Sequence, residues 1–200
     1  MSKVVVFDYG AGNLRSVLNT LGAIGAQYEL VDDAAGLESA EKIILPGVGH
    51  FGQMIRSLDA MRVRQTILDR IDAGVPLLGI CLGLQCLFAA SEEAPDLKGL
   101  SVFPETVRRF TGDVRIPQMG WNQLEVRRES RLLKGLGDKP YFYYANSYHA
   151  PLCSSTVATS NYTVDFTAAI ERDNLFGVQF HPEKSGPLGL KIMKNFVELD

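Results

Sequence analysis

The segment PLLGICLGLQ (residues 76–85) joins a continuously apolar run to a cysteine with a glycine two positions before it and another two positions after it. A short apolar run bounded by turn signals is typical of a strand buried on both faces, and the residues after Cys81 fit the start of a helix. Gly79 and Gly83 allow a strained backbone and, because they lack side chains, do not crowd the cysteine between them. The segment therefore predicts a sharp strand-to-helix turn with Cys81 at its tip.

The same alternation of apolar and amphipathic stretches extends toward the N-terminus. Apolar, strand-like runs occupy residues 3–8, 28–31 and 42–45. Between them, apolar residues recur with a helical period at 14–21, where Asn13 is placed to cap the helix, and again at 63–71. Buried strands separated by helices predict an α/β fold, namely a doubly wound, mostly parallel sheet with helices on both faces.

The second half of the chain is richer in short extended pieces. They lie at residues 124–126, 141–144, 162–166 and 176–180, between clusters of Gly, Pro, Asn and Ser. This pattern predicts a β-rich half that adds antiparallel strands to the sheet. A final helix is expected over residues 188–196. The sequence shows no internal repeat and no linker, so we expect one domain over residues 1–200.

Composition and charge narrow the class of protein. The 200 residues carry a net charge of −3 and are 46% hydrophobic, which fits a globular protein with no basic field for nucleic acid. The apolar run at residues 3–7 is too short for a signal peptide, and no segment approaches a membrane span of about 20 apolar residues. The three cysteines and three histidines show no metal-ligand spacing. We expect a cytoplasmic protein without metal, cofactor or membrane partner.

Cys81 is the candidate nucleophile. A cysteine at a strand-to-helix turn occupies the position that serine has in α/β hydrolases, and a helix N-terminus favours the thiolate over the thiol. Alternatively, Cys81 is a small buried hydrophobe, the usual state of a free cysteine. Cys86 is better explained as core, and Cys153 has no assignment.

A thiol nucleophile needs a base, and His181 is the candidate. It ends an apolar run, and Glu183 follows two residues later, on the same side of an extended chain, where its carboxylate can orient the imidazole. The alternative is a strand-end histidine paired with a surface glutamate. His50 and His149 fit structural or peripheral roles better.

Acyl transfer also requires donors for an oxyanion. One donor is expected from the amide of Leu82, directly after the nucleophile. The second is expected from the loop Gly47-Val48-Gly49, which follows the strand at 42–45 and has glycines that let a peptide plane reorient. The alternative is that this loop is only a turn.

Several separated motifs together resemble one family. They are DYGAGN (8–13), PGVG (46–49) with FG (51–52), GICLGLQ (79–85), MGWN (119–122), NSY (146–148) and FHPEKS (180–185). The chain resembles the class I (triad) glutamine amidotransferases, and among them the glutaminase subunits of imidazole glycerol phosphate synthase. The resemblance extends over the full length and implies the fold of that family.

The resemblance implies a role for each matching residue. Cys81 attacks the side-chain amide of glutamine to form a glutamyl thioester, His181 transfers protons and Glu183 orients His181. Glutamine is held with the help of Gln85, Ser147 and Tyr148. The family also implies a heterodimer with a (β/α)8 cyclase subunit that receives the ammonia for histidine biosynthesis and stimulates the glutaminase. Tyr141 and Lys184 are candidates for that interface.

Two other functions remain possible from the residues alone. A stand-alone cysteine hydrolase or a thiol sensor would explain Cys81 but would leave His181-Pro182-Glu183 as a coincidence. A nucleotide-binding module could use Gly10-Ala11-Gly12 after the first strand, but Arg15 occupies the third glycine position of that fingerprint.

Overall fold

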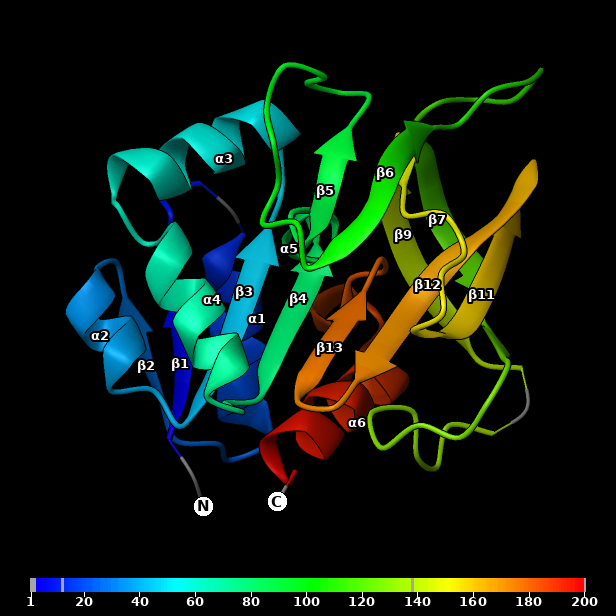
Figure 1. The fold of residues 1–200 in the computed structure, drawn as a ribbon. Coiled ribbons are helices and arrows are strands. Elements are labelled where there is room, and N and C mark those ends of the chain that lie inside the picture. Colours follow the sequence, from blue (N-terminus) through cyan, green and yellow to red (C-terminus); the bar gives the residue numbers. More distant parts are fainter. Residues whose placement is uncertain (1–2, 12, 138, 200) are drawn as a thin grey trace.

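The computed structural model describes residues 3–11, 13–137 and 139–199. Gly12, part of the predicted glycine turn, lies outside the described residues. The central sheet has eight strands in the order β2-β1-β3-β4-β13-β12-β11-β8 (Figure 1). They are β1 (Val4–Phe7), β2 (Tyr28–Val31), β3 (Lys42–Gly47), β4 (Leu77–Cys81), β8 (Glu125–Val126), β11 (Thr156–Tyr162), β12 (Val164–Arg172) and β13 (Leu175–Val178). The pairs from β2 to β13 are parallel, and β12, β11 and β8 extend the sheet antiparallel. The predicted fold class is confirmed.

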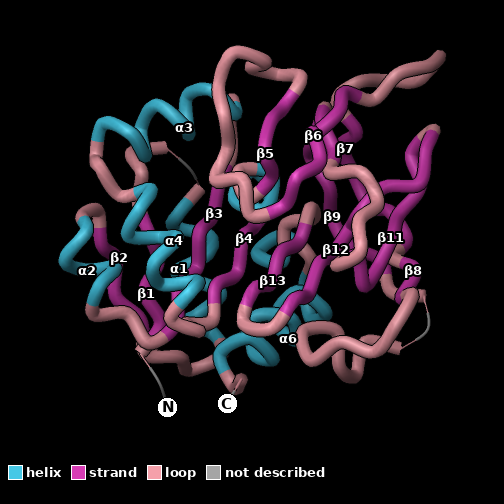
Figure 2. Tube along the Cα trace, viewed as in Figure 1, coloured by secondary structure: helices cyan, strands magenta, loops and turns pink. Residues whose placement is uncertain are grey.

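Helices cover both faces of the parallel half because side chains alternate along its strands. Val4 and Val6 of β1 belong to the core that includes α1 (Leu14–Ala23) and α6 (Gly186–Val197). Val5 and Phe7 belong to the core on the other face, under α2 (Ala34–Glu38), α3 (Phe51–Ala60) and α4 (Arg64–Asp72). Figure 2 shows helices α1 to α4 gathered around β1 to β4, whereas the half that contains β11 and β8 is mostly strand and loop.

Two small sheets adjoin the central one. The first contains β5 (Phe88–Ser91), β6 (Phe103–Arg109) and β10 (Tyr148–His149), and the second pairs β7 (Gln118–Gln123) with β9 (Tyr141–Asn146). After β13 the chain forms the 3₁₀ helix η1 (Pro182–Lys184), which packs against β9. The carboxyl ends of β3, β4 and β13 meet at one edge of the sheet, the edge at which α/β folds place their ligands.

Some sequence predictions of local structure were wrong. The single strand expected at 162–166 is interrupted by a hairpin turn: Tyr162 ends β11, Thr163 turns the chain with a φ of +69°, and residues 164–166 begin β12. Asn13 stands at the N-cap of α1, but its side chain makes no capping hydrogen bond. Pro46 and Gly47 do not end the strand before them, because β3 continues through both to pair with β4.

Helices α2 and α3 were not predicted from the sequence. In the part of the chain that the structure describes, no helix is long and apolar enough to cross a membrane.

Candidate active site

Cys81 ends β4 and directly precedes α5 (Leu82–Gln85). Its φ is +53°, a left-handed conformation that non-glycine residues rarely adopt and that is characteristic of strained functional positions. The two flanking glycines make the tight turn possible. A Cβ on Gly79 would lie 2.6 Å from the carbonyl oxygen of Gly83, and a Cβ on Gly83 would collide with the carbonyl oxygen of Leu45. The predicted strand-to-helix turn is present at Cys81.

The helix after Cys81 is shorter than the sequence suggested. It has four residues, and the chain re-enters a strand at Phe88. A single turn has few aligned peptide dipoles, so it contributes less positive potential at the sulfur than a full helix would. Stabilisation of a thiolate therefore depends on the side chains around it.

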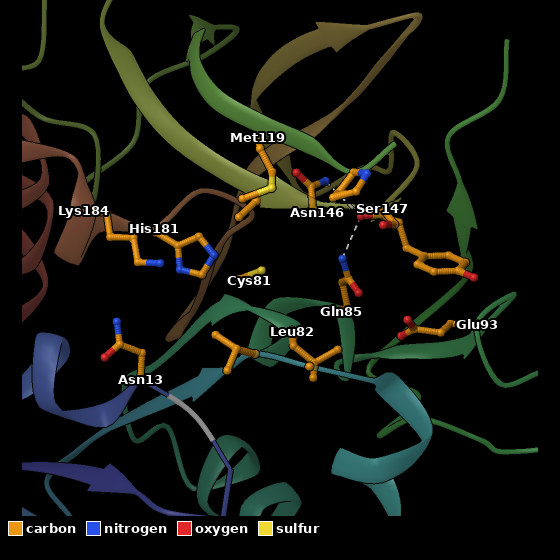
Figure 3. Close-up of a pocket in the computed structure, with 15 residues that line it drawn as sticks. Asn13, Cys81, Leu82, Gln85, Glu93, Met119, Asn146, Ser147, His181 and Lys184 are labelled. Atoms are coloured by element: carbon orange, nitrogen blue, oxygen red, sulfur yellow. Dashed lines mark hydrogen bonds between the residues drawn. The ribbon is translucent and has the colours of Figure 1, made fainter. Parts of the chain in front are cut away.

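Cys81 opens into a cavity of about 420 Å³ (Figure 3). Its lining comes from the edges of several elements that are far apart in sequence. The lining residues are Asn13, Val48, Gly49, Cys81, Leu82, Gln85, Glu93, Pro117, Met119, Ala145, Asn146, Ser147, Tyr148, His181 and Lys184.

His181 faces Cys81 across this cavity (Figure 3). Its Nδ1 is 2.8 Å from Oε1 of Glu183, and both side chains are almost completely buried. The backbone of His181 is fixed from outside the sheet, because its N–H donates to the carbonyl of Tyr143 in β9 at 2.9 Å. The bond to Glu183 occupies Nδ1 and leaves Nε2 to serve the sulfur.

The surroundings of His181 favour its protonated form. Burial lowers the pKa of His181, but the negative charge of Cys81 and the hydrogen bonds to Cys81 and Glu183 raise it to about 10 overall. Negative charge on the sulfur or on Glu183 therefore favours the imidazolium form of His181. The imidazolium becomes a stronger acid when the sulfur loses its charge.

The glycine loop lies beside Cys81 but is held by a tyrosine. Gly47 pairs with Cys81 in the sheet, and Val48 and Gly49 line the cavity. The N–H of Val48 donates to Oη of Tyr9 at 3.1 Å, and Oη donates to the Val48 carbonyl at 3.0 Å. Burial raises the pKa of Tyr9 to about 12, which keeps the hydroxyl protonated for this second bond. In this structure the Val48 N–H is therefore bonded to Tyr9.

On the opposite wall of the cavity, the side chain of Gln85 connects several residues by hydrogen bonds. Nε2 of Gln85 donates to the carbonyl of Tyr148 at 2.8 Å and to Oε1 of Gln179 at 3.0 Å. Nδ2 of Asn146 donates to the same Tyr148 carbonyl at 2.9 Å. Gln85, Ser147 and Tyr148, the residues expected to hold substrate, thus lie together on one wall.

Comparisons with known proteins agree with this geometry. Residues 5–199 match the family model "Glutamine amidotransferase class-I". The chain belongs to the class-I glutamine amidotransferases. Among their curated members, the "Imidazole glycerol phosphate synthase subunit HisH" of Methanothermobacter thermautotrophicus is 46% identical, and the match covers 98% of each chain. The protein of the same name from Thermococcus kodakarensis is 47% identical over 98% of this chain and 100% of its own.

Two solved structures share the fold of this chain. "Structure of PurLQS from Thermotoga maritima" superposes with a TM-score of 0.77 at 20% identity and covers 98% of both chains. Another, "Crystal structure of glutamine amidotransferase", gives a TM-score of 0.76 at 19% identity and covers 97% of both chains. At such identities the likeness shows the fold alone.

Three polar residues around this cavity were given no role from the sequence, although Asn146 belongs to the NSY motif. Glu93 and Asn146 line it, and Gln179 contacts Cys81 from within the core. Glu93 lies in an acidic stretch that reads as ordinary surface, so no signal marked it. Gln179 offered a signal, because it is the polar residue inside an otherwise apolar run at 175–180.

The other histidines and cysteines are not among the residues that line this cavity. His50 caps α3, where its Nδ1 accepts from the N–H of Gly52 at 3.0 Å. His149 is buried and stacks on Phe110 with 4.6 Å between ring centroids. Cys86 is buried in the core, and Cys153 is half-buried. Among the interface candidates, Tyr141 is 51% exposed, and Lys184 lines the cavity together with Cys81 and His181.

Proposed function

We propose that this chain is a glutaminase that supplies ammonia to the cyclase of an imidazole glycerol phosphate synthase. The observation that carries the proposal is the buried Cys81, His181 and Glu183 constellation beside a cavity with a wall of amide groups. The relatives named HisH support the choice of synthase, since they match this chain from end to end.

In the first half of the reaction, the Cys81 thiolate attacks the side-chain amide carbon of glutamine. The new S–C bond forms as the carbonyl electron pair moves onto oxygen, and the sulfur loses its negative charge. His181 then becomes a stronger acid and gives its Nε2 proton to the amide nitrogen. The C–N bond breaks, ammonia leaves and a glutamyl thioester remains on Cys81.

In the second half, neutral His181 accepts a proton from water, whose oxygen attacks the thioester. The C–S bond breaks, the new side-chain carboxylic acid releases its proton to solvent to give glutamate, and the thiolate–imidazolium pair is restored. Glu183 holds the imidazole by Nδ1 throughout and stabilises each imidazolium state. The backbone amides of Leu82 and Val48 would bind the oxyanion in both halves, provided that Val48 is released from Tyr9.

The cavity offers groups that match the two charges of the amino acid. Glu93 lines it beside Gln85 (Figure 3), and its carboxylate suits the α-ammonium group of glutamine. Ser147 and Tyr148 also line the cavity, and we infer that their backbone N–H groups bind the α-carboxylate. This arrangement would leave the side-chain amide directed at Cys81.

One face of the β7–β9 ribbon fits a protein partner. Met119, Trp121 and Tyr141 are 61%, 58% and 51% exposed, although they are large apolar or aromatic side chains. Met119 and Lys184 also line the cavity, and Nζ of Lys184 lies 5.7 Å from the ring centroid of Tyr143. Exposed aromatic side chains gathered at one place mark interaction sites. A cyclase seated here would receive ammonia at the mouth of the cavity.

The test is glutamate release from glutamine, measured for this chain alone and with a cyclase partner plus its ribotide ligand. We expect release that rises when the partner is added and that disappears in Cys81→Ala. Glutamate release that does not change when the partner is added would support the glutaminase activity but refute the choice of synthase. No glutamate under either condition would refute the proposal.

A further inference from the structure

Gln179 is a completely buried amide that the mechanism above does not use. It directly follows β13, whose last residue, Val178, pairs with Ile80 of β4. The next position along these parallel strands therefore places Gln179 beside Cys81. On its other side, the backbone N–H of Gln179 donates to the carbonyl of Ala168 at 2.9 Å, which fixes the segment against β12.

Both ends of the Gln179 amide contact functional groups. Nε2 lies 3.6 Å from Sγ of Cys81 and donates to it, and Oε1 accepts from Nε2 of Gln85 at 3.0 Å. Gln85 in turn donates to the Tyr148 carbonyl in the cavity wall. A continuous set of hydrogen bonds thus joins the reacting sulfur to the substrate wall. Buried amides require partners, and here the donor is directed at the atom that becomes charged.

We propose that Gln179 is a positioning residue of the active site, which donates a hydrogen bond to the Cys81 thiolate and fixes the sulfur relative to Gln85. The inference rests on the proposed function, in which Cys81 is the nucleophile. Gln179 complements His181 because a carboxamide does not titrate. The sulfur therefore keeps this donor whatever the charge of His181, and the bond is strongest when the sulfur is a thiolate, since hydrogen bonds to an ionised acceptor are the stronger ones.

Three variants separate the contacts of Gln179. Gln179→Met keeps a similar length but removes the donor to sulfur, and Gln179→Asn keeps the amide on a chain one carbon shorter. Gln85→Met breaks the Gln85–Gln179 bond without touching the sulfur. Asn174→Ala is the matched control, because Asn174 is the amide at the other end of β13 and donates to the carbonyls of Ile71 and Val75, away from Cys81.

The main measurement is the rate at which iodoacetamide alkylates Cys81, followed between pH 5 and 10 by peptide mass spectrometry so that Cys86 and Cys153 are counted separately. Near pH 6.5 we expect Gln179→Met and Gln179→Asn to react about tenfold more slowly, the size of a hydrogen bond to a charged group. The midpoint of the profile moves up by about one pH unit. In glutaminase assays kcat falls more than KM rises.

The other two variants distinguish a positioning role of Gln179 from a purely structural one. Gln85→Met should raise KM and leave the alkylation midpoint in place, and Asn174→Ala should change thermal stability alone. The inference is overturned if the profiles of both Gln179 variants overlay that of the wild type, or if Asn174→Ala shifts the midpoint equally. If Gln179→Met does not fold, Gln179→Asn decides. Wild-type glutamate release is measured in parallel, so failure of the proposed function would be seen separately.

Discussion

The two groups of residues beside Cys81 differ in how completely they are arranged for catalysis. On the side of the sulfur, His181 is already oriented by Glu183, and both side chains are buried. On the side of the glycine loop, the Val48 N–H is bonded to Tyr9. The side chains proposed to transfer protons are therefore already in place in this structure, whereas one of the two proposed oxyanion donors is occupied.

This difference follows from what holds each side. The sulfur side is built on strand ends and on a histidine whose backbone is bonded to β9. The loop side depends on two hydrogen bonds to a single phenol. Exchanging those bonds for others requires only a local rearrangement, and a ligand or partner that binds the rearranged loop more tightly would shift the population toward it. A glutaminase that is weak alone and stimulated by its partner is expected from such an arrangement.

The largest effect on activity is expected when the His181–Glu183 pair is disrupted. Glu183→Gln removes the charge that stabilises the imidazolium and allows the amide to donate to Nδ1, which favours the wrong tautomer. We expect kcat for glutamate release, with the partner present, to fall by roughly 10³- to 10⁴-fold. The pKa of His181 should also fall, which NMR titration of the imidazole can measure. A loss of less than tenfold would show that this carboxylate is not part of the catalytic group.

A smaller effect, in the opposite direction, is expected on the loop side. Tyr9→Phe removes the hydroxyl that occupies the Val48 N–H, and a buried N–H without a partner is unfavourable. The loop should therefore turn more often toward Cys81. Since one oxyanion donor contributes roughly 10²- to 10³-fold, we expect partner-free activity to rise by about tenfold and the stimulation by the partner to shrink.

The glycines of the loop give a less direct test than Tyr9. A Cβ on Gly47 would lie 2.8 Å from the backbone N of Gly83, so Gly47→Ala disturbs the turn at Cys81 itself. Gly49 has a φ of +95°, and alanine there is strained in the present conformation. Partner-free activity of Tyr9→Phe that stays at the wild-type value would contradict the inhibitory role of the Tyr9 contact.

The sequence predicted the residues that need a particular backbone and missed those that need a particular neighbour. Gly79 and Gly83 mark a turn that few other residues permit, so Cys81 could be located without coordinates. His181 and Glu183 are close in sequence, and their pairing follows from extended geometry. These are local properties, which a single sequence reveals well.

The contacts that the sequence did not reveal are between residues distant along the chain. Tyr9 and Val48 are separated by 39 positions and Gln179 and Cys81 by 98, and their contacts depend on the order and register of the strands. The hairpin at Thr163 was missed for another reason, because threonine gives no signal for a positive φ. Tertiary structure, not local propensity, selects such conformations.

The smallest effect is expected on the pH dependence of stability, and it involves His149, a second buried histidine. A variant of His149 separates the effect of pH on stability from the effect of pH on catalysis. Burial lowers the pKa of His149, so the folded chain keeps it neutral where the unfolded chain takes up a proton. The free energy of unfolding should therefore be unaffected by His149 above pH 6.5 and should decrease as the pH falls below it, with a slope of at most about 1.4 kcal/mol per pH unit.

His149→Phe keeps an aromatic ring against Phe110 and should remove this part of the acid sensitivity. Urea unfolding of both proteins between pH 5 and 8 measures the difference, and parallel curves would assign the acid sensitivity to other groups. Glutaminase pH profiles that coincide for the two proteins would show that His149 does not contribute to the pH dependence of catalysis.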